Sequence, residues 1–322
     1  MKLKLSKNWI DYIKPAMILI FVVFIIWKVP IFLRPDNLIT LIPQAAVIGI
    51  ASIGMSMVII SGEIDISVGA ILYCSGAIAS EVFMSTRSLI YASLAAVLSG
   101  AVFGLVNGFG VAKLKIPSMI TTLAVSYILT GLGSILIGSE STLVAGDDYK
   151  ALSQTKILGM TSNVWIFVFL FVIFAVIINK TRFGRYIYAI GDNADALRAS
   201  GINVDRVQAY IFILTGLLCG VGGLLTTSRL GGTQFNMSLG TEVYCIAAVV
   251  VGGIRMSGGK GSIFGSLLGI LMVASLDNIL RLTHISVYLY NLVWGVVIFI
   301  IVLIDILKKK QHIWNDIHKI SN

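Results

Sequence analysis

Long apolar stretches separated by short polar segments set the pattern of this chain. A membrane-spanning helix needs about 20 mainly apolar residues, so the pattern predicts about ten spans. They cover 16–33, 44–61, 68–80, 89–112, 119–138, 163–179, 207–228, 240–254, 262–280 and 286–306. The third and eighth are short for a full crossing and rich in glycine. Whether these two cross completely or are broken, re-entrant helices stays open.

Composition supports the same fold class. The 322 residues are 57% hydrophobic and 12% charged, about half the charged fraction of soluble proteins. The prediction is an all-α, polytopic integral membrane protein without a sizeable soluble domain. We divide it into a basic N-terminus, 1–15, one transmembrane domain, 16–307, and a polar tail, 308–322. Within the domain, 180–206 is the longest predicted cytosolic loop.

Lysine and arginine predict the orientation. With the N-terminus inside and alternating spans, 17 of the 24 Lys and Arg residues lie on the inner side and 7 on the outer side. Cytoplasmic loops carry this excess, so both termini are expected in the cytosol. The net charge of +9 then indicates attraction to anionic lipid rather than to nucleic acid. The basic lead-in and long first span do not resemble a cleaved secretory signal.

A small polar island, 192–206, lies between two of the most apolar spans. Its first part has the signals of a separate short helix. Asp192 or Asn193 is suited to cap the N-terminus, Arg198 lies near the last turn, and Gly201 fits the position just past the end. The segment is therefore predicted to be a compact helix presented to the cytosol.

Two interpretations of this short helix remain open. Ala194 and Leu197 share one face, and the other side chains are small. Such a helix could fit a groove on a cytosolic partner, or it could lie on the lipid surface. Helices of the second kind use Trp and Phe on a broad apolar face, which this segment lacks. Docking to a partner is therefore the favoured interpretation.

A second motif, 61–69, holds two carboxylates between two apolar segments. Acidic groups at membrane depth are costly and usually face an interior cavity or a partner. Glu63 and Asp65 are two residues apart and cannot share a helix face, so an irregular turn through Gly62 and Gly69 is expected. Asp65 is either a latch or gate beside a permeation path, or a solvated loop carboxylate.

The glycine-rich segment 252–262 does not match the phosphate-binding loop. That loop needs G-x-x-x-x-G-K-[ST], and here Lys260 is followed by Gly261 while no predicted strand precedes the segment. We expect no nucleotide site. The segment is either a flexible turn with two cytosolic cations or a broken helix that lines a path.

Glycines four residues apart recur within the spans, as at Gly100, Gly104 and Gly108. This spacing lets helix backbones approach closely. Bundle packing is the simpler interpretation, and helix sliding during gating is the alternative. The same spacing occurs at Gly216 and Gly220 and at Gly265 and Gly269.

Polar residues at helix depth are candidates for lining a path, and Asn107 and Glu242 are the best of them. The others are Gln44, Thr121, Thr122, Ser126, Gln234, Asn236 and Asn291. Enzymatic motifs such as HExxH or G-x-S-x-G do not occur, and there is no ladder of intramembrane carboxylates. The three cysteines lie inside predicted spans, so neither a disulfide nor a metal site is expected.

Three motifs together resemble a known family. Residues 61–69, 191–207 and 250–269 look like those of the permease subunits of bacterial ABC importers for monosaccharides, the ribose/xylose/galactose type, which includes autoinducer-2 permeases. The likeness runs from about Gln44 to Lys310. One departure is Glu63, where the family commonly has a second glycine, which leaves the conformation of that turn open.

The resemblance implies an inner-membrane importer subunit without catalysis of its own. A cytosolic ATPase would use ATP and Mg, an extracytoplasmic binding protein would deliver a small sugar-like solute, and a second permease, the same or homologous, would complete the path. No cofactor is expected on this chain. The alternative is a self-contained secondary transporter or channel, which would need its own coupling-ion site.

The resemblance also implies roles for particular residues. The expected coupling residues are Asn193, Ala194, Ala196, Leu197, Arg198, Ser200 and Gly201. For the path, only Asp65, Ser67 and Gly69 match a signature of the family. Together with the polar residues at helix depth and the glycine-rich segment, the residues expected to line or gate the path are Gln44, Asp65, Ser67, Gly69, Asn107, Thr121, Glu242, Gly252, Gly253, Gly258 and Gly259.

Overall fold

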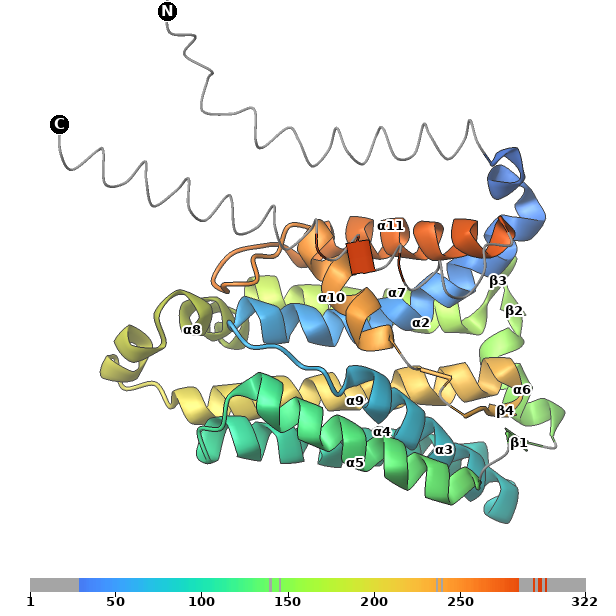
Figure 1. Ribbon diagram of the computed structural model, residues 1–322, viewed down its shortest axis with the longest axis horizontal. Coiled ribbons are helices and arrows are strands. Elements are labelled where there is room, and N and C mark those ends of the chain that lie inside the picture. Colours follow the sequence, from blue (N-terminus) through green and yellow to red (C-terminus); the bar gives the residue numbers. More distant parts are fainter. Residues whose placement is uncertain are drawn as a thin grey trace, which may run out of the picture.

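The computed structural model is a bundle of helices that mostly run along one long axis (Figure 1). It describes residues 29–283 except 139, 140, 145, 236 and 239, together with 292, 295, 296 and 299. Seven described helices are long and apolar enough to cross a membrane. They are α2 (Pro35–Ile60), α3 (Val68–Thr86), α4 (Leu89–Gly108, continued by the π-helix η2, Phe109–Lys113), α5 (Ser118–Ile137), α7 (Ser162–Lys180), α9 (Val204–Leu230) and α11 (Ile263–Leu282).

Shorter elements complete the described part. They are the 3-10 helix η1 (Pro30–Leu33), α6 (Asp147–Gln154), α8 (Arg182–Ala199) and α10 (Thr241–Val251), with the two-residue strands β1 (Thr142–Leu143), β2 (Lys156–Ile157), β3 (Met160–Thr161) and β4 (Gly232–Thr233). β1 pairs antiparallel with β4, and β2 with β3. The segment between α5 and α7 is therefore structured rather than a plain loop. Tyr149 of α6 is fully buried and bonded to Thr227 of α9 at 2.6 Å.

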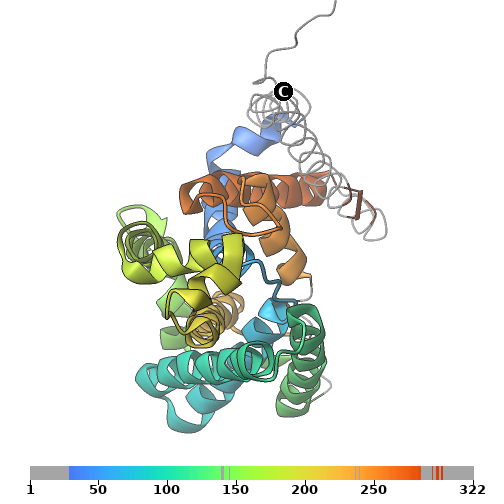
Figure 2. The same cartoon turned by 90° about the vertical axis from the view of Figure 1, so that its left-hand side faces the viewer.

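Helix α9 lies at the centre and packs against α2, α3 and α4 (Figure 2). Its contact with α4 depends on glycine. A Cβ added at Gly100 would lie only 2.9 Å from the Gly220 backbone, and one at Gly216 only 2.8 Å from that of Gly104. Gly252 and Gly265 bring α10 and α11 together in the same way. The glycine spacing seen in the sequence is thus confirmed as a device for close helix packing.

The observed helices correct several predicted spans. α2 begins nine residues before the predicted 44, and α3 continues to Thr86, so the expectation that 68–80 is short was wrong. Glu81 interrupts the apolar run, but it sits within the helix and is half-buried. α10, with 11 residues, is short as predicted. The predicted spans 16–33 and 286–306 lie mostly or wholly outside the described residues.

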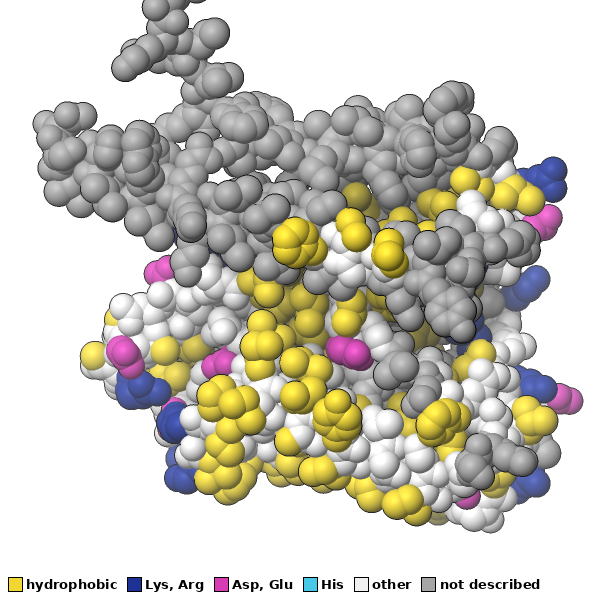
Figure 3. Space-filling view, in the orientation of Figure 1, with side chains coloured by type: hydrophobic (Ala, Val, Ile, Leu, Met, Phe, Trp, Pro, Cys, Tyr) yellow, Lys and Arg dark blue, Asp and Glu magenta, His cyan; other side chains and the backbone are white. Residues whose placement is uncertain are grey.

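Most charged side chains gather at the two ends of the long axis, and the stretch between them is mainly apolar, with one acidic side chain visible near its middle (Figure 3). This is the distribution a hydrocarbon layer about 30 Å thick requires. One end carries α8 and the turns 61–67, 114–117 and 252–262. The turn 252–262 contacts α8 and the turn 61–67, and the turns 61–67 and 114–117 both contact the start of α9. These are the connections that the lysine and arginine bias assigns to the cytosol, and we call this the basic end.

Candidate functional site

The polar island forms a short helix of its own at the basic end. Within α8 the backbone breaks at Asn193, whose φ of −159° and ψ of 95° are not helical. Asn193 Oδ1 accepts the amide N–H of Ala196 at 2.9 Å, so it is the N-cap of the second half. Gly201 follows the last turn at φ +82° and donates its N–H to Arg198 O at 3.0 Å. Both predicted helix boundaries are confirmed, with Asn193 rather than Asp192 as the cap.

The structure divides the expected coupling residues between two faces. Ala194 and Leu197 are half-buried and pack against the hydrophobic core of the chain itself. The face turned to solvent is made of small and polar side chains. It consists of Asp192, Asn193, Asp195, Ala196, Arg198, Ala199 and Ser200, and we call it the exposed α8 face. Leu197 therefore anchors the short helix, and the exposed α8 face is what another protein would meet.

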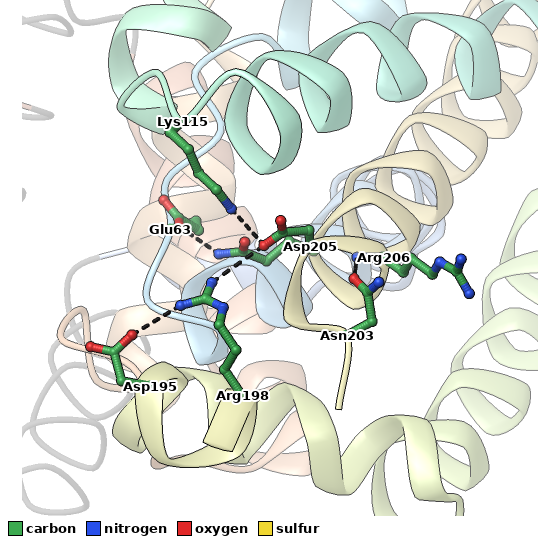
Figure 4. Close-up of polar contacts among 8 residues, drawn as sticks. Glu63, Lys115, Asp195, Arg198, Asn203, Asp205 and Arg206 are labelled. Atoms are coloured by element: carbon green, nitrogen blue, oxygen red, sulfur yellow. Dashed lines mark hydrogen bonds and ion pairs between the residues drawn. The ribbon is translucent and has the colours of Figure 1, made fainter. Parts of the chain in front are cut away.

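Ion pairs connect the short helix to two neighbouring elements (Figure 4). Arg198 Nη1 lies 2.9 Å from Asp195 Oδ1, and Arg198 Nη2 lies 3.3 Å from Asp205 Oδ1 in the first turn of α9. Lys115, in the turn before α5, lies 2.5 Å from the same Asp205 oxygen. All four side chains are at least 41% exposed, so each pair adds little stability, about 1 kcal/mol or less. Their effect is to join three elements through one carboxylate.

Glu63 contributes a further contact between the turn 61–67 and α9. Its Oε1 accepts Gln208 Nε2 at 3.1 Å, and the side chain is half-buried (Figure 4). Burial raises the pKa of the Glu63 carboxyl, while the Ser118 hydroxyl and the Lys115 charge act against this rise. The departure from the family pattern thus places a second carboxylate near the ion pairs of Asp205.

Asp65 is fully buried, so the alternative of a solvated loop carboxylate is wrong for it. One of its oxygens accepts Ser67 N at 2.8 Å and Ser67 Oγ at 2.6 Å. The Ser67 hydroxyl in turn accepts Asn107 Nδ2 from α4 at 2.7 Å. Burial raises the pKa of Asp65 to about 6, although the two bonds from Ser67 lower it. Asp65, Ser67 and Asn107 are therefore brought together, and they fasten the turn to α4, while their role in a path stays a prediction.

The glycine-rich segment closes the basic end as a packed turn. Gly259 donates its N–H to Ile60 O at the end of α2, at 2.8 Å. Gly258, at φ +78°, lies so close to Gly62 and Gly191 that an added Cβ would be about 3 Å from their backbones. The interpretation of a flexible turn is corrected to that of a tight one. The described contacts of Gly252, Gly258 and Gly259 are with α11, α8, the end of α2 and the turn 61–67. That these glycines and Gly253 line a path stays a prediction.

The remaining path candidates lie in separate places. Gln44 donates to Asp277 Oδ2 at 2.7 Å and so links α2 to α11. Thr121 is buried against Gly110 at the junction of η2 and α5. Gly69 and Glu242 are brought together, beside a recess between α3, α5 and α10. Of the nine helix-depth candidates, Asn236 and Asn291 lie outside the described residues.

Four residues that line this recess had no predicted role. They are Ala70, Tyr73, Thr130 and Ser238. Ser126, noted in the sequence as polar at helix depth, lines it too. The signal that could have found Thr130 is the regular recurrence of hydroxyl side chains every four residues along α5.

The apolar belt, the charged ends and the central glycine-packed helices define a multi-pass membrane protein. A profile of the family described as the permease component of branched-chain amino acid transport systems matches residues 37–302. The chain therefore belongs to this family of transport permeases and is a multi-pass membrane protein, as predicted.

Curated relatives are similar in sequence to this chain over most of their length. The ribose import permease protein RbsC of Escherichia coli (strain K12) is 34% identical over 311 residues, which are 95% of this chain and 96% of that protein. RbsC of Bacillus subtilis (strain 168) is 38% identical over 278 residues, 86% of each chain. The L-arabinose ABC transporter permease protein AraH of Azospirillum brasilense is 32% identical over 283 residues, 88% of this chain and 84% of that protein. No solved structure matches the chain.

Proposed function

We propose that this chain is the membrane-spanning subunit of an ABC importer and that it carries a monosaccharide into the cytosol by alternating access. The family description mentions branched-chain amino acids, but the similar curated permeases are those for ribose and L-arabinose. Their identity of 32–38% over most of the chain supports a sugar rather than an amino acid. The monosaccharide itself is left unspecified.

The observation that carries the proposal is the exposed α8 face at the basic end. The short helix is capped at both ends, anchored by Leu197, and presents small side chains such as Ala196 and Ala199 to solvent. Small side chains let another protein approach the helix backbone closely. We propose that a cytosolic ATPase receives this helix and that ATP-driven closure of the ATPase moves it.

The energy source follows from the same assignment. The sequence lacks a phosphate-binding loop, so ATP and Mg would be bound by the ATPase and no cofactor by this chain. An extracytoplasmic binding protein would supply the sugar, and a second permease, identical or homologous, would complete the path. We further propose ten spans in one domain, 16–307, with both termini cytosolic and the coupling loop at 180–206.

A self-contained secondary transporter is the alternative. It would need a buried carboxylate free to bind a coupling ion. Among the described residues, the two most buried carboxylates each have one oxygen held within the chain, Asp65 by Ser67 and Asp277 by Gln44 and Arg281. Glu242 is a further carboxylate at helix depth. The similarity to the ribose and L-arabinose permeases, rather than a lack of carboxylates, therefore supports the importer over the ion-coupled alternative.

Site-directed crosslinking tests the assignment. Ala196→Cys places a thiol on the exposed α8 face, and Ala194→Cys is the matched control on the inner side of the same helix. The native cysteines are all buried. In membranes from the native host, a short thiol-to-amine crosslinker should join the 196 variant to a nucleotide hydrolase and the 194 variant much less. Labelling of position 196 from outside the cell, or capture of no hydrolase, contradicts the proposal.

Transport provides the second test. The energy source of uptake separates the two candidates. An importer of this kind takes up sugar only when ATP is present together with its ATPase and receptor. Uptake by the chain alone in vesicles, driven by an ion gradient, would support the secondary transporter instead.

A further inference from the structure

Hydroxyl side chains recur at every fourth position along α5. The series is Ser118, Thr122, Ser126, Thr130 and Ser134. Residues four apart lie on one helix face, so the series forms a single track, here called the α5 hydroxyl track. Thr122, Thr130 and Ser134 each donate to the carbonyl four residues earlier at 2.8 Å. These bonds use the hydroxyl protons and leave the oxygen lone pairs available as acceptors.

The cytoplasmic part of the track is already occupied. Ser118 Oγ accepts the amide of Ile64 at 3.2 Å, and Thr122 Oγ1 accepts that of Ile66 at 3.0 Å. These two hydroxyls hold the turn 61–67 in place. The next two, Ser126 and Thr130, instead face the recess between α3, α5 and α10.

The recess lies near the middle of the membrane. Ser126 and Thr130 come 8 and 12 residues after the start of α5, which at 1.5 Å per residue is about 12 and 18 Å along the helix. Half of a hydrocarbon core about 30 Å thick is about 15 Å. The recess also lies at the start of the short helix α10, and interrupted helices of this kind commonly form transporter sites near the midplane.

Its lining combines polar side chains from three helices and a turn with Gly69 and Ala70. Tyr73 comes from α3, Ser238 from the turn before α10, and Glu242 from the first turn of α10. The free volume of the recess is about 30 Å³, which is room for about one water molecule. A sugar ring would therefore enter only when α3, α5 and α10 move apart, as alternating access requires.

Of the residues that line the recess, Glu242 is energetically the least favourable at membrane depth. A carboxylate at membrane depth is energetically unfavourable and is a functional candidate for that reason. The Glu242 carboxylate accepts the backbone N–H groups of Glu242 and Gly240, and Gly69 leaves space beside it, since a Cβ there would collide with Glu242 Oε2. A carboxylate has about four acceptor positions, so two backbone bonds leave capacity for a ligand that donates hydrogen bonds.

From this geometry we propose that the recess binds the hydroxyl groups of the sugar in transit. Glu242 accepts hydrogen bonds from two neighbouring sugar hydroxyls, Thr130 accepts a bond from another, Ser126 donates or accepts one, and Tyr73 contributes its ring. A ligand that both donates and accepts around its whole edge fits a lining of one carboxylate and several hydroxyls. The inference rests on the proposed function and specifies which residues recognise the substrate class.

Substitutions test the recess against a matched control on the same helix. Glu242→Gln and Thr130→Val keep the side-chain size and remove the charge or the hydroxyl, whereas Tyr127→Phe removes a hydroxyl from a side chain that is 76% exposed away from the recess. The assay measures the initial uptake of tritiated ribose, L-arabinose and xylose by cells of the native host. In these cells the gene for this permease is deleted, and each variant is supplied in its place. Immunoblots of membranes verify equal amounts of protein.

For the sugar that wild type transports, we expect uptake to fall at least tenfold with Glu242→Gln and about threefold or more with Thr130→Val, because hydrogen bonds to charged groups are the stronger ones. Tyr127→Phe should stay within twofold. If Glu242→Gln and Thr130→Val both transport sugar at the wild-type rate, the proposed sugar-binding role of the recess is overturned, while the proposed importer function still stands. If wild type takes up none of the three sugars and no hexose in a widened panel, the proposed sugar function is overturned and the recess with it.

Thiol protection gives a readout independent of transport rate. Ser126→Cys places a thiol in the recess, and Tyr127→Cys places one on the exposed side of α5. In membrane preparations, excess of the transported sugar should slow labelling of position 126 by a small maleimide at least threefold and leave position 127 unchanged. Equal labelling with and without sugar shows that the recess holds no sugar. The same conclusion follows if position 126 is protected without sugar and becomes reactive only when detergent extracts the lipid, because lipid is then what covers the thiol.

Discussion

Arg198 on the short helix of α8 and Lys115 before α5 share one carboxylate oxygen, Asp205 Oδ1. The three residues come from segments that are far apart in the sequence, and Asp205 opens the central helix α9. A displacement of the short helix therefore acts on α9 and on the α4–α5 turn through the same atom. This arrangement offers a direct mechanical link between the exposed α8 face and the core of the bundle.

Replacing Asp205 with Asn should weaken coupling more than stability. The pairs are exposed, so unfolding should change by about 1 kcal/mol or less, whereas ATP-driven uptake should fall severalfold because both cations lose their shared partner. The measurement is uptake beside the thermal stability of the purified complex. Asp195→Asn is the matched control, since Asp195 is 93% exposed and pairs only with Arg198 among the described contacts. Equal loss of uptake in both variants would argue against a special role for Asp205.

The buried carboxylate of Asp65 predicts a pH dependence of stability. Its pKa is raised from 3.8 to about 6 by burial, so the folded protein binds this proton more tightly than the unfolded chain. The contribution of Asp65 is therefore most favourable below about pH 4. It declines as pH rises to about 6 and is constant above that value, with a total change on the order of 3 kcal/mol.

Asp65→Asn should remove this part of the pH profile. Thermal unfolding in detergent between pH 4 and 7 measures the difference between variant and wild type, which should grow with pH in favour of Asn. The Asn side chain keeps an acceptor for Ser67. A difference that is the same at every pH means that Asp65 does not titrate in this range.

Much of the fold could be predicted because hydrophobicity and glycine spacing are local signals. The caps of the short helix at Asn193 and Gly201 were also readable, since each acts on residues three or four positions away. The length of α3 was not, because Glu81 looks like a helix boundary in sequence but is accommodated within a helix. The elements between α5 and α7 were missed, because short strands such as β1 form only by pairing with a distant segment.

The site was only partly predictable, because polar residues at helix depth look alike in sequence. Asn107 and Glu242 were both candidates for the path, yet Asn107 bonds to Ser67 whereas Glu242 faces the recess. The difference depends on which helix each residue meets, and this is a long-range property. Loop charge alone places the exposed α8 face at the basic end, but the inward turn of Leu197 required the packed structure.

Glycine packing between α4 and α9 predicts a contrast between two substitutions of the same kind. Gly216→Ala would place a Cβ 2.8 Å from the Gly104 backbone and should destabilise the protein by about 1–3 kcal/mol through overpacking. Gly131→Ala meets nothing within 4 Å and should be neutral or stabilising by up to about 1 kcal/mol through helix propensity. Thermal unfolding of both variants in detergent measures the contrast. Similar effects for both would mean that α4 and α9 are not in close contact.

Gln44 predicts a loss of stability without a change in sugar preference. Its Nε2 donates to Asp277 Oδ2 at 2.7 Å, and Asp277 is 1% exposed with Arg281 as its other partner at 2.9 Å. Gln44→Leu fills similar space but removes a donor from a buried carboxylate, which should cost about 1–3 kcal/mol. The ratio of uptake rates for ribose, L-arabinose and xylose should stay as in wild type, because the pair joins α2 to α11 and does not line the recess. If the ratio of uptake rates changes while stability does not, Gln44 lines the translocation path and does not stabilise the contact between α2 and α11.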